Sequence, residues 1–300
     1  MDLSRRRFFK VAGATGAAVV VARPRGARAR TLPRHANGRA MLVDTTRCLG
    51  CRACEAACSE ANGLPEPAMA GDPAVFNKTR PTDERTFTVV NAFDNPRQPG
   101  ETRFVKRQCM HCVEPACASA CLTKALEKTE TGPVVYHKDR CLGCRYCMVA
   151  CPFEVPKYEY AKANPYVMKC TFCAERQKAG KLPACAEVCP GGALQAGTRE
   201  ELLDVARLRI YQEPDRYVHH IYGEHEVGGT SWLYITDVPF EKLGFDTNLG
   251  QNPYSALTQT ALSAVPLVIT LWPPLLMGLY TFSKRCDEVA GAEDGEERDE

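Results

Sequence analysis

Two apolar stretches lie near opposite ends of the chain and differ in length and strength. Residues 11–22 form a short, weakly apolar run rich in Ala, Gly and Val, whereas residues 261–282 contain no charged side chain. At 1.5 Å per helical residue the second run would extend about 33 Å, enough to cross the hydrocarbon core of a bilayer. A buried core helix is the alternative. The pattern favours a transmembrane helix over residues 256–283, kinked at Pro266, Pro273 and Pro274.

Between these ends, short runs rich in apolar and β-branched residues predict strands, and one segment predicts a helix. Pro, Gly and Asn punctuate much of residues 59–108, so we expect a loop-rich insertion there. The pattern predicts a helix over residues 198–210, and strands at 41–44, 86–90, 125–127, 134–136 and 232–236, with a return strand starting within 191–194.

The polar flanks of the two apolar stretches predict export and a membrane orientation. Residues 4–10 read S-R-R-R-F-F-K, which looks like a twin-arginine export signal, and Ala27-Arg28-Ala29 fits a cleavage site. We therefore expect residues 1–29 to be a signal peptide; a disordered basic tail is the alternative. Lys284 and Arg285 follow the C-terminal run, so the positive-inside rule places the acidic tail, residues 284–300, in the cytoplasm. The intervening domain would then lie on the periplasmic face of the bacterial cytoplasmic membrane.

Charge and composition narrow the function classes. The 300 residues carry a net charge of +2, but residues 1–29 contribute +6, so the remainder is mildly acidic at −4. Such a chain without a clustered basic face gives no reason to expect a nucleic-acid partner. Seventeen cysteines are far more than a chain of this length needs for packing, so their spacing must indicate their purpose.

Sixteen of the cysteines fall into four groups of four, each ending in x3-C. Groups one and three have the spacing C-x2-C-x2-C-x3-C, whereas the second gap is four residues in group two and eleven in group four. In chain order the groups are Cys48, Cys51, Cys54, Cys58; Cys109, Cys112, Cys117, Cys121; Cys141, Cys144, Cys147, Cys151; and Cys170, Cys173, Cys185, Cys189.

This spacing fits [4Fe-4S] clusters better than other uses of cysteine. A tight loop can place three sulfurs on three irons of a cube, and in two-cluster ferredoxins the fourth cysteine binds the other cluster. Zinc sites need only two C-x2-C pairs and would leave the third cysteine of each loop idle. Disulfides suit an exported protein, but they do not explain a register repeated four times. The sequence thus predicts four [4Fe-4S] clusters with iron bound through sixteen cysteines.

The order of the groups predicts nested ferredoxin-like units. Groups two and three are close in sequence and would form an inner unit over residues 103–160, so groups one and four would pair around it. We expect an α+β fold of two nested, loop-rich bacterial-ferredoxin-like dicluster units spanning residues 40–197. A connector over residues 198–255, without a catalytic constellation, would contact partners and lead to the one C-terminal transmembrane helix.

The chain resembles the four-cluster iron–sulfur subunits of bacterial respiratory oxidoreductases, and most closely the iron–sulfur subunit of hydrogenase-2-type nickel–iron hydrogenases. The first resemblance covers about residues 40–195. The stretches that carry the second are residues 104–112, 144–152, 197–202, 220–224 and 228–239, together with the twin-arginine leader and the single C-terminal span.

The resemblance implies how the ligands are shared among four clusters, here named a to d. Cluster a would be bound by Cys48, Cys51, Cys54 and Cys189, and cluster b by Cys58, Cys170, Cys173 and Cys185. Cluster c would be bound by Cys109, Cys112, Cys117 and Cys151, and cluster d by Cys121, Cys141, Cys144 and Cys147.

The resemblance also implies a non-catalytic electron-transfer subunit for anaerobic respiration. Its partners would be the hydrogenase small and large subunits and an integral membrane quinone-reactive subunit. One alternative is the same role beside a molybdopterin enzyme such as formate dehydrogenase. Others are a self-contained enzyme with an open cluster, which full cysteine ligation argues against, and a zinc-stabilised membrane interaction module.

Four residues outside the ligand sets have reactive side chains. We expect His219 and His220 to be packing or interface residues rather than ligands. His111, inside group two, could tune a cluster by hydrogen bonding, but a solvent-facing loop position is slightly favoured. Cys286 has no partner in the pattern and is expected to be an unremarkable thiol.

Overall fold

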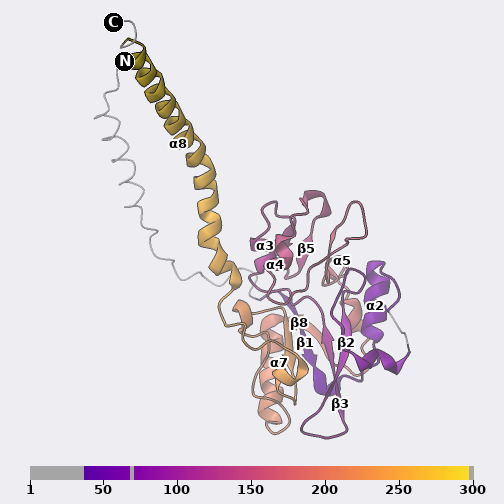
Figure 1. The fold of residues 1–300 in the computed structure, drawn as a ribbon. Coiled ribbons are helices and arrows are strands. Elements are labelled where there is room, and N and C mark those ends of the chain that lie inside the picture. Colours follow the sequence, from indigo (N-terminus) through magenta and orange to yellow (C-terminus); the bar gives the residue numbers. More distant parts are fainter. Residues whose placement is uncertain (1–36, 68–70, 297–300) are drawn as a thin grey trace. The chain divides into compact units, whose positions relative to one another are not determined.

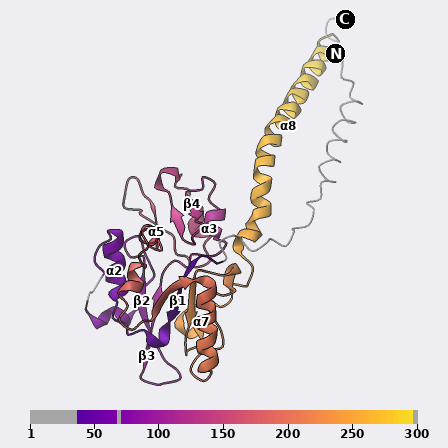
Figure 2. The ribbon, with the colours of Figure 1, turned by 180° about the vertical axis from the view of Figure 1, so that it is seen from behind.

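The computed structural model describes residues 37–67 and 71–296 (Figures 1 and 2). The expected signal peptide, residues 1–29, lies outside the described residues. Within them the chain combines short strands and helices with long connecting loops, which confirms the α+β fold class.

A three-stranded sheet lies at the centre of the structure. Its strands are β1 (Arg39–Asp44), β8 (Leu194–Thr198) and β9 (Trp232–Ile235), in the order β8-β1-β9. Strand β1 is antiparallel to β8 and parallel to β9. The strands that precede group one and follow group four are therefore neighbours, although about 150 residues separate them.

Both faces of the sheet are buried because its strands direct apolar side chains to both sides. Met41 and Val43 pack on one face with Trp232 and Tyr234 in a large aromatic core. Leu42, Leu233 and Ile235 face the opposite side, where Leu202, Leu203 and Ala206 of helix α7 (Arg199–Gln212) cover them. Figure 1 shows α7 running beside β1 and β8.

A second sheet corrects the expectation of a loop-rich insertion. Strand β2 (Val89–Asp94) pairs antiparallel with β3 (Thr102–Arg107). The sequence pattern did not predict β3. The strand expected at 86–90 begins later because Val89 pairs with Arg107, the last residue of β3. Helix α2 (Ala53–Asn62) is tied to β2 through Glu55, whose buried carboxylate accepts the N–H of Val90 at 2.6 Å.

Groups two and three are embedded in two short hairpins and two short helices. The hairpin expected at 125–136 is confirmed as β4 (Leu126–Lys128) and β5 (Val134–Tyr136), and β6 (Lys157–Tyr158) pairs with β7 (Val167–Met168). Helices α3 (Ala116–Ser119) and α4 (Tyr146–Val149) lie beside the first hairpin (Figures 1 and 2). Cys117, Cys147, Leu126, Val134 and Val167 form their common core.

Group four lies on two further short helices, α5 (Ala174–Lys178) and α6 (Ala184–Glu187). The chain ends in one long helix, α8 (Tyr254–Glu296), with Pro266, Pro273 and Pro274 inside it. Its segment Ala264–Val289 is long and apolar enough to cross a membrane, and none of that window is buried against the described chain. The helix therefore confirms a candidate C-terminal span.

Candidate iron–sulfur centres

The four cysteine groups share one local design. The third cysteine of each group is the second residue of a short helix: Cys54 in α2, Cys117 in α3, Cys147 in α4 and Cys185 in α6. The fourth cysteine lies one turn further along or just past the helix end. A helix N-terminus therefore approaches each set of sulfurs, and its dipole favours the negative charge of a thiolate.

A left-handed turn curls the loop near the second cysteine of every group. Arg52 and Arg145 occupy equivalent positions in groups one and three with φ of 59° and 60°. His111 has φ of 46° in group two, and Phe172 has φ of 56° in group four. Within these loops backbone N–H groups point at sulfur: Phe172 N lies 3.3 Å from Cys170 Sγ, and Gly143 N lies 3.4 Å from Cys141 Sγ.

The four expected ligand sets each combine two groups, and the influence of one thiol on another indicates which thiols lie near each other. Mutual repulsion, secondary to burial, raises the pKa of neighbouring thiols. The pKa of Cys48 is raised by Cys189 and Cys51, and that of Cys54 by Cys185 and Cys48. Cys58, whose pKa burial raises to about 12, is raised further by Cys185 and Cys173, and Cys170 by Cys58.

In the remaining two sets, neighbouring thiols raise one another's pKa in the same way. After burial, the pKa of Cys112 is raised by Cys151, Cys117 and Cys109. Burial brings the pKa of Cys147 to about 11, with further contributions from Cys141, Cys121 and Cys144. These influences place the fourth cysteine of each group near at least one cysteine of the group expected to share its cluster.

Zinc bound by four thiolates at about 2.3 Å requires sulfurs almost in contact. Among residues 37–67 and 71–296, no three His, Cys, Asp or Glu side chains are close enough to hold one metal ion. The described residues therefore do not form a compact site for a single zinc ion.

Exposure of the cysteines distinguishes the sets. The set around Cys48 includes the exposed Cys51, and the set around Cys147 includes the exposed Cys144. The other two sets contain no exposed cysteine and are mostly buried. Two sets are therefore accessible from the surface and two are enclosed.

His111 is buried, which corrects the expectation that it faces solvent. Its ring is 1% exposed and stacks on Phe172 with the ring centroids 4.8 Å apart. Nδ1 accepts the N–H of Val134 at 2.9 Å, so the neutral ring carries its proton on Nε2. Burial, with Lys169 and Lys128 nearby, holds its pKa well below the ordinary value. In the sequence, the one sign of this role is that the histidine lies between Cys109 and Cys112.

The other singled-out residues have structural surroundings. His220 Nε2 lies 2.7 Å from Glu226 Oε1 and packs edge-on against Phe240, while His219 Nε2 contacts the carbonyl of Pro214. Both agree with the expected packing role. Cys286 is exposed on α8.

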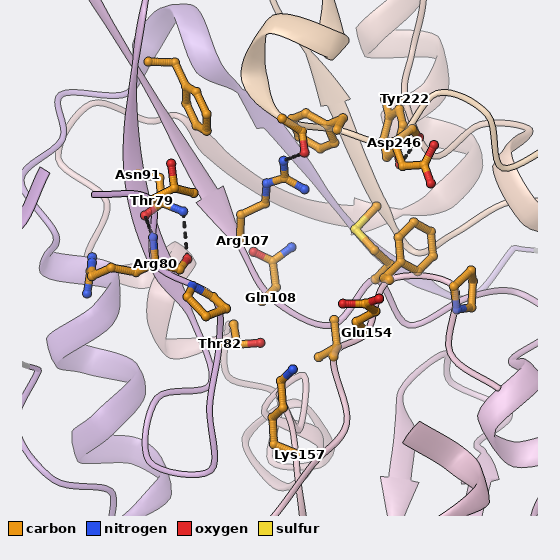
Figure 3. Close-up of a pocket in the computed structure, with 18 residues that line it drawn as sticks. Thr79, Arg80, Thr82, Asn91, Arg107, Gln108, Glu154, Lys157, Tyr222 and Asp246 are labelled. Atoms are coloured by element: carbon orange, nitrogen blue, oxygen red, sulfur yellow. Dashed lines mark hydrogen bonds between the residues drawn. The ribbon is translucent and has the colours of Figure 1, made fainter. Parts of the chain in front are cut away.

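A pocket of about 470 Å³ is lined by residues that neighbour Cys109 and Cys151 in the chain, among them Gln108 and Pro152 (Figure 3). Arg107 reaches across its wall to the carbonyls of Leu243 and Gly244. Lys157 and Glu154 also line it, so charged side chains of both signs lie within a largely apolar lining.

Comparison with known proteins agrees with this geometry. Residues 101–199 match the 4Fe-4S dicluster domain. A protein of Nitratidesulfovibrio vulgaris is 47% identical over 98% of this chain and 80% of its own length. The hydrogenase-2 operon protein HybA of Escherichia coli O157:H7 is 39% identical over 80% of this chain and 83% of its own.

A more distant match is the iron–sulfur subunit of the nitrate-inducible formate dehydrogenase of Escherichia coli K12. It is 34% identical over 65% of this chain and 67% of its own length. The chain therefore belongs to the family of iron–sulfur electron-transfer subunits that includes HybA and the formate dehydrogenase iron–sulfur subunits.

Proposed function

We propose that this protein holds four [4Fe-4S] clusters and relays electrons from a periplasmic hydrogenase to a quinone-reactive membrane subunit. It performs no chemistry on a substrate itself. The observation that carries the proposal is the assembly of sixteen cysteines into four sets, two reached from the surface and two enclosed. When bound, the clusters supply one-electron redox chemistry, and the chain holds them in place and shields the inner two from water.

The ligand sets follow the proximity of the thiols. Clusters a to d take the cysteines that the family resemblance assigns to them. The pairwise effects reported above support this assignment, since all of them except that of Cys185 on Cys54 fall within one of these sets. The domain limits rest on the same assignment, with the cluster domain at 40–197, its inner unit at 103–160 and the connector at 198–255.

Contacts between sets support a linear order a-b-c-d. After burial, the pKa of Cys54 in set a is raised by Cys185 in set b, and that of Cys170 in set b by Cys109 in set c. The pKa of Cys117 in set c is likewise raised by Cys147 in set d. The exposed Cys51 and Cys144 then lie at opposite ends of the relay, where two partners would exchange electrons.

The ends of the chain support a periplasmic location. The leader at residues 1–29 would direct export, the segment at 256–283 within α8 would cross the membrane, and the tail at 284–300 would remain cytoplasmic. Hydrogenase small and large subunits are the proposed catalytic partners because the HybA match covers more of this chain than the formate dehydrogenase match.

A formate dehydrogenase-type enzyme is the second candidate for the catalytic partner, on the strength of the 34% identical relative. Copurification of the solubilised native complex separates the two. We expect nickel-containing hydrogenase subunits, and a molybdopterin subunit in their place would contradict the hydrogenase assignment.

The ligand assignment is tested by a Cys147→Ser variant of the same complex. Spin-resonance spectra should show the signal of one cluster lost or altered and three unchanged. Four unchanged signals would rule out Cys147 as a ligand, and a Cys286→Ser variant, which lies outside every set, is the matched control.

A further inference from the structure

Three lysines carry their positive charge into the interior beside the cysteine sets. Lys106 and Lys169 are 2% and 5% exposed, and Lys128 is partly buried. The described lysines that form ion pairs are Lys162, Lys178 and Lys284, all near the surface. Within residues 37–67 and 71–296, no carboxylate lies at ion-pair distance from Lys106, Lys128 or Lys169.

Lys106 lies between sets a and b. Its ammonium donates to Gln108 Oε1 at 3.0 Å and lies 4.5 Å from the centroid of the Trp232 ring. Cys185 belongs to the same buried cluster as Trp232, and Cys54 packs against that cluster. Gln108 is itself fixed by donating to the Tyr234 hydroxyl, which donates to the carbonyl of Lys106. This closed network holds the ammonium in one place.

The charge of Lys106 acts on both neighbouring sets. It opposes the effect of burial on the pKa of Cys48 and Cys54 in set a and of Cys58, Cys170 and Cys173 in set b.

Lys128 lies beside set c, and Lys169 lies between sets b and c. Lys128 Nζ donates to the carbonyl of His111 at 2.9 Å, inside the loop of group two, and Lys169 Nζ donates to the carbonyl of Cys170 at 3.1 Å. Lys128 opposes the rise in the pKa of Cys112, and Lys169 does so for Cys117 and Cys151. No lysine is among the main influences on Cys121 or Cys147 of set d.

A buried ammonium without a carboxylate is costly unless another anion compensates it. A [4Fe-4S] core with four thiolates has a net negative charge, and each electron it accepts adds one more. A fixed positive charge nearby stabilises the reduced form more than the oxidised form and so raises the reduction potential.

On this basis, and resting on the proposed electron-transfer function, we propose that Lys106 is a positioning residue shared by clusters a and b that raises the reduction potential of both. Lys128 does the same for cluster c and Lys169 for clusters b and c, and among the described residues no buried lysine lies beside cluster d. An electron supplied by the catalytic partner is thereby favoured on clusters a, b and c over cluster d, and no bond forms or breaks.

The test is a redox titration of the solubilised native complex, followed by electron spin resonance, with each signal assigned by a Cys→Ser variant in its own loop. In Lys106→Met, the midpoint potentials of clusters a and b should fall while those of c and d stay at the wild-type values. Lys106→Arg keeps the charge and should restore wild-type potentials. In Lys128→Met, only the potential of cluster c should fall.

Iron content and the presence of four spin-resonance signals test the proposed function separately from the effect of the lysines on the reduction potentials. Full iron with unshifted a and b potentials in Lys106→Met would overturn the inference, as would an equal shift of all four clusters. A Lys106→Arg variant whose a and b midpoint potentials fall as those of Lys106→Met do would overturn it too. If Lys106→Met fails to assemble, Lys128→Met decides: a fall in c alone upholds the inference, and no change overturns it.

Discussion

At the scale of single residues, Glu55 is a buried anion that joins three parts of the cluster domain. Its carboxylate accepts hydrogen bonds from Arg52 at 2.8 Å and Arg80 at 2.6 Å as well as from the N–H of Val90. Burial alone would raise the pKa of Glu55, but these donors hold it below the ordinary value. Because α2 carries Cys54 and Cys58, the same contacts fix the helix that presents two sulfurs.

Glu55→Gln removes this charge without changing the side-chain shape. Breaking a buried ion pair typically costs about 3–5 kcal/mol, so the unfolding midpoint of the iron-loaded protein should fall clearly in urea. Glu60→Gln, an exposed position on the same helix, should stay near wild type. Equal midpoints for the two variants would contradict the role of Glu55.

The His220–Glu226 pair predicts a pH-dependent contribution to stability. The hydrogen bond that His220 donates to the Glu226 carboxylate raises the pKa of His220 above 6.5. Burial would raise the pKa of Glu226, but His220 and backbone N–H groups lower it below 4.5. The stabilisation from His220 is complete below pH 6.5 and is lost as pH rises through its raised pKa. That from Glu226 is present above pH 4.5 and is lost as pH falls through its lowered pKa.

A His220→Gln variant should therefore lose most thermal stability relative to wild type at pH about 5.5, and less at pH about 8.5. Thermal unfolding at the two pH values measures this. A difference that does not change with pH would contradict an ionised pair.

At the scale of elements, much of the structure follows from local pattern. The expected strands at 41–44 and 232–236, the hairpin at 125–136 and the helix at 198–210 are present because each has a clear apolar alternation, turn or cap. Strand β3 was missed because its sequence, TRFVKR, is strongly charged. Its charges are satisfied by distant partners such as Asp237, which pairs with Arg103 at 2.7 Å.

The gathering of the cysteines could be anticipated only in part. Spacing predicts which three cysteines share a loop, since they are close in sequence. Which loop supplies the fourth sulfur depends on long-range pairing, such as β1 with β8, and no local signal encodes it. The burial of His111 and Lys106 likewise depends on the tertiary contacts with Phe172 and Trp232.

Helix α7 offers a test of a local signal. Thr198 and Glu201 form a capping box, with Thr198 N donating to Glu201 Oε2 at 3.0 Å and Glu201 N to Thr198 Oγ1 at 3.4 Å. Thr198→Ala should lower the free energy of unfolding by about 1 kcal/mol, whereas Thr198→Ser keeps the hydroxyl and should remain close to wild type. Chemical denaturation compares them, and equal losses would show that the hydroxyl does not cap the helix.

At the scale of the whole molecule, α8 is the candidate membrane span of the described chain. Leu271 lies in the middle of the candidate span and is half exposed. Arginine at the centre of a span opposes insertion by about 2.5–3.5 kcal/mol, so Leu271→Arg should shift the protein from the membrane fraction toward the soluble fraction. Leu271→Phe should stay in the membrane fraction. Full retention of the arginine variant after an alkaline wash would contradict a spanning helix.

The central claim about this protein is that sixteen of its cysteines hold four [4Fe-4S] cubes. Metal and sulfide analysis of the full-length protein in its native complex, with iron assigned to this chain, tests that claim directly. It predicts about sixteen irons and about sixteen acid-labile sulfides per chain, with no stoichiometric zinc. Zinc in place of iron, or about twelve irons or fewer in a protein with all its cysteines intact, would contradict it.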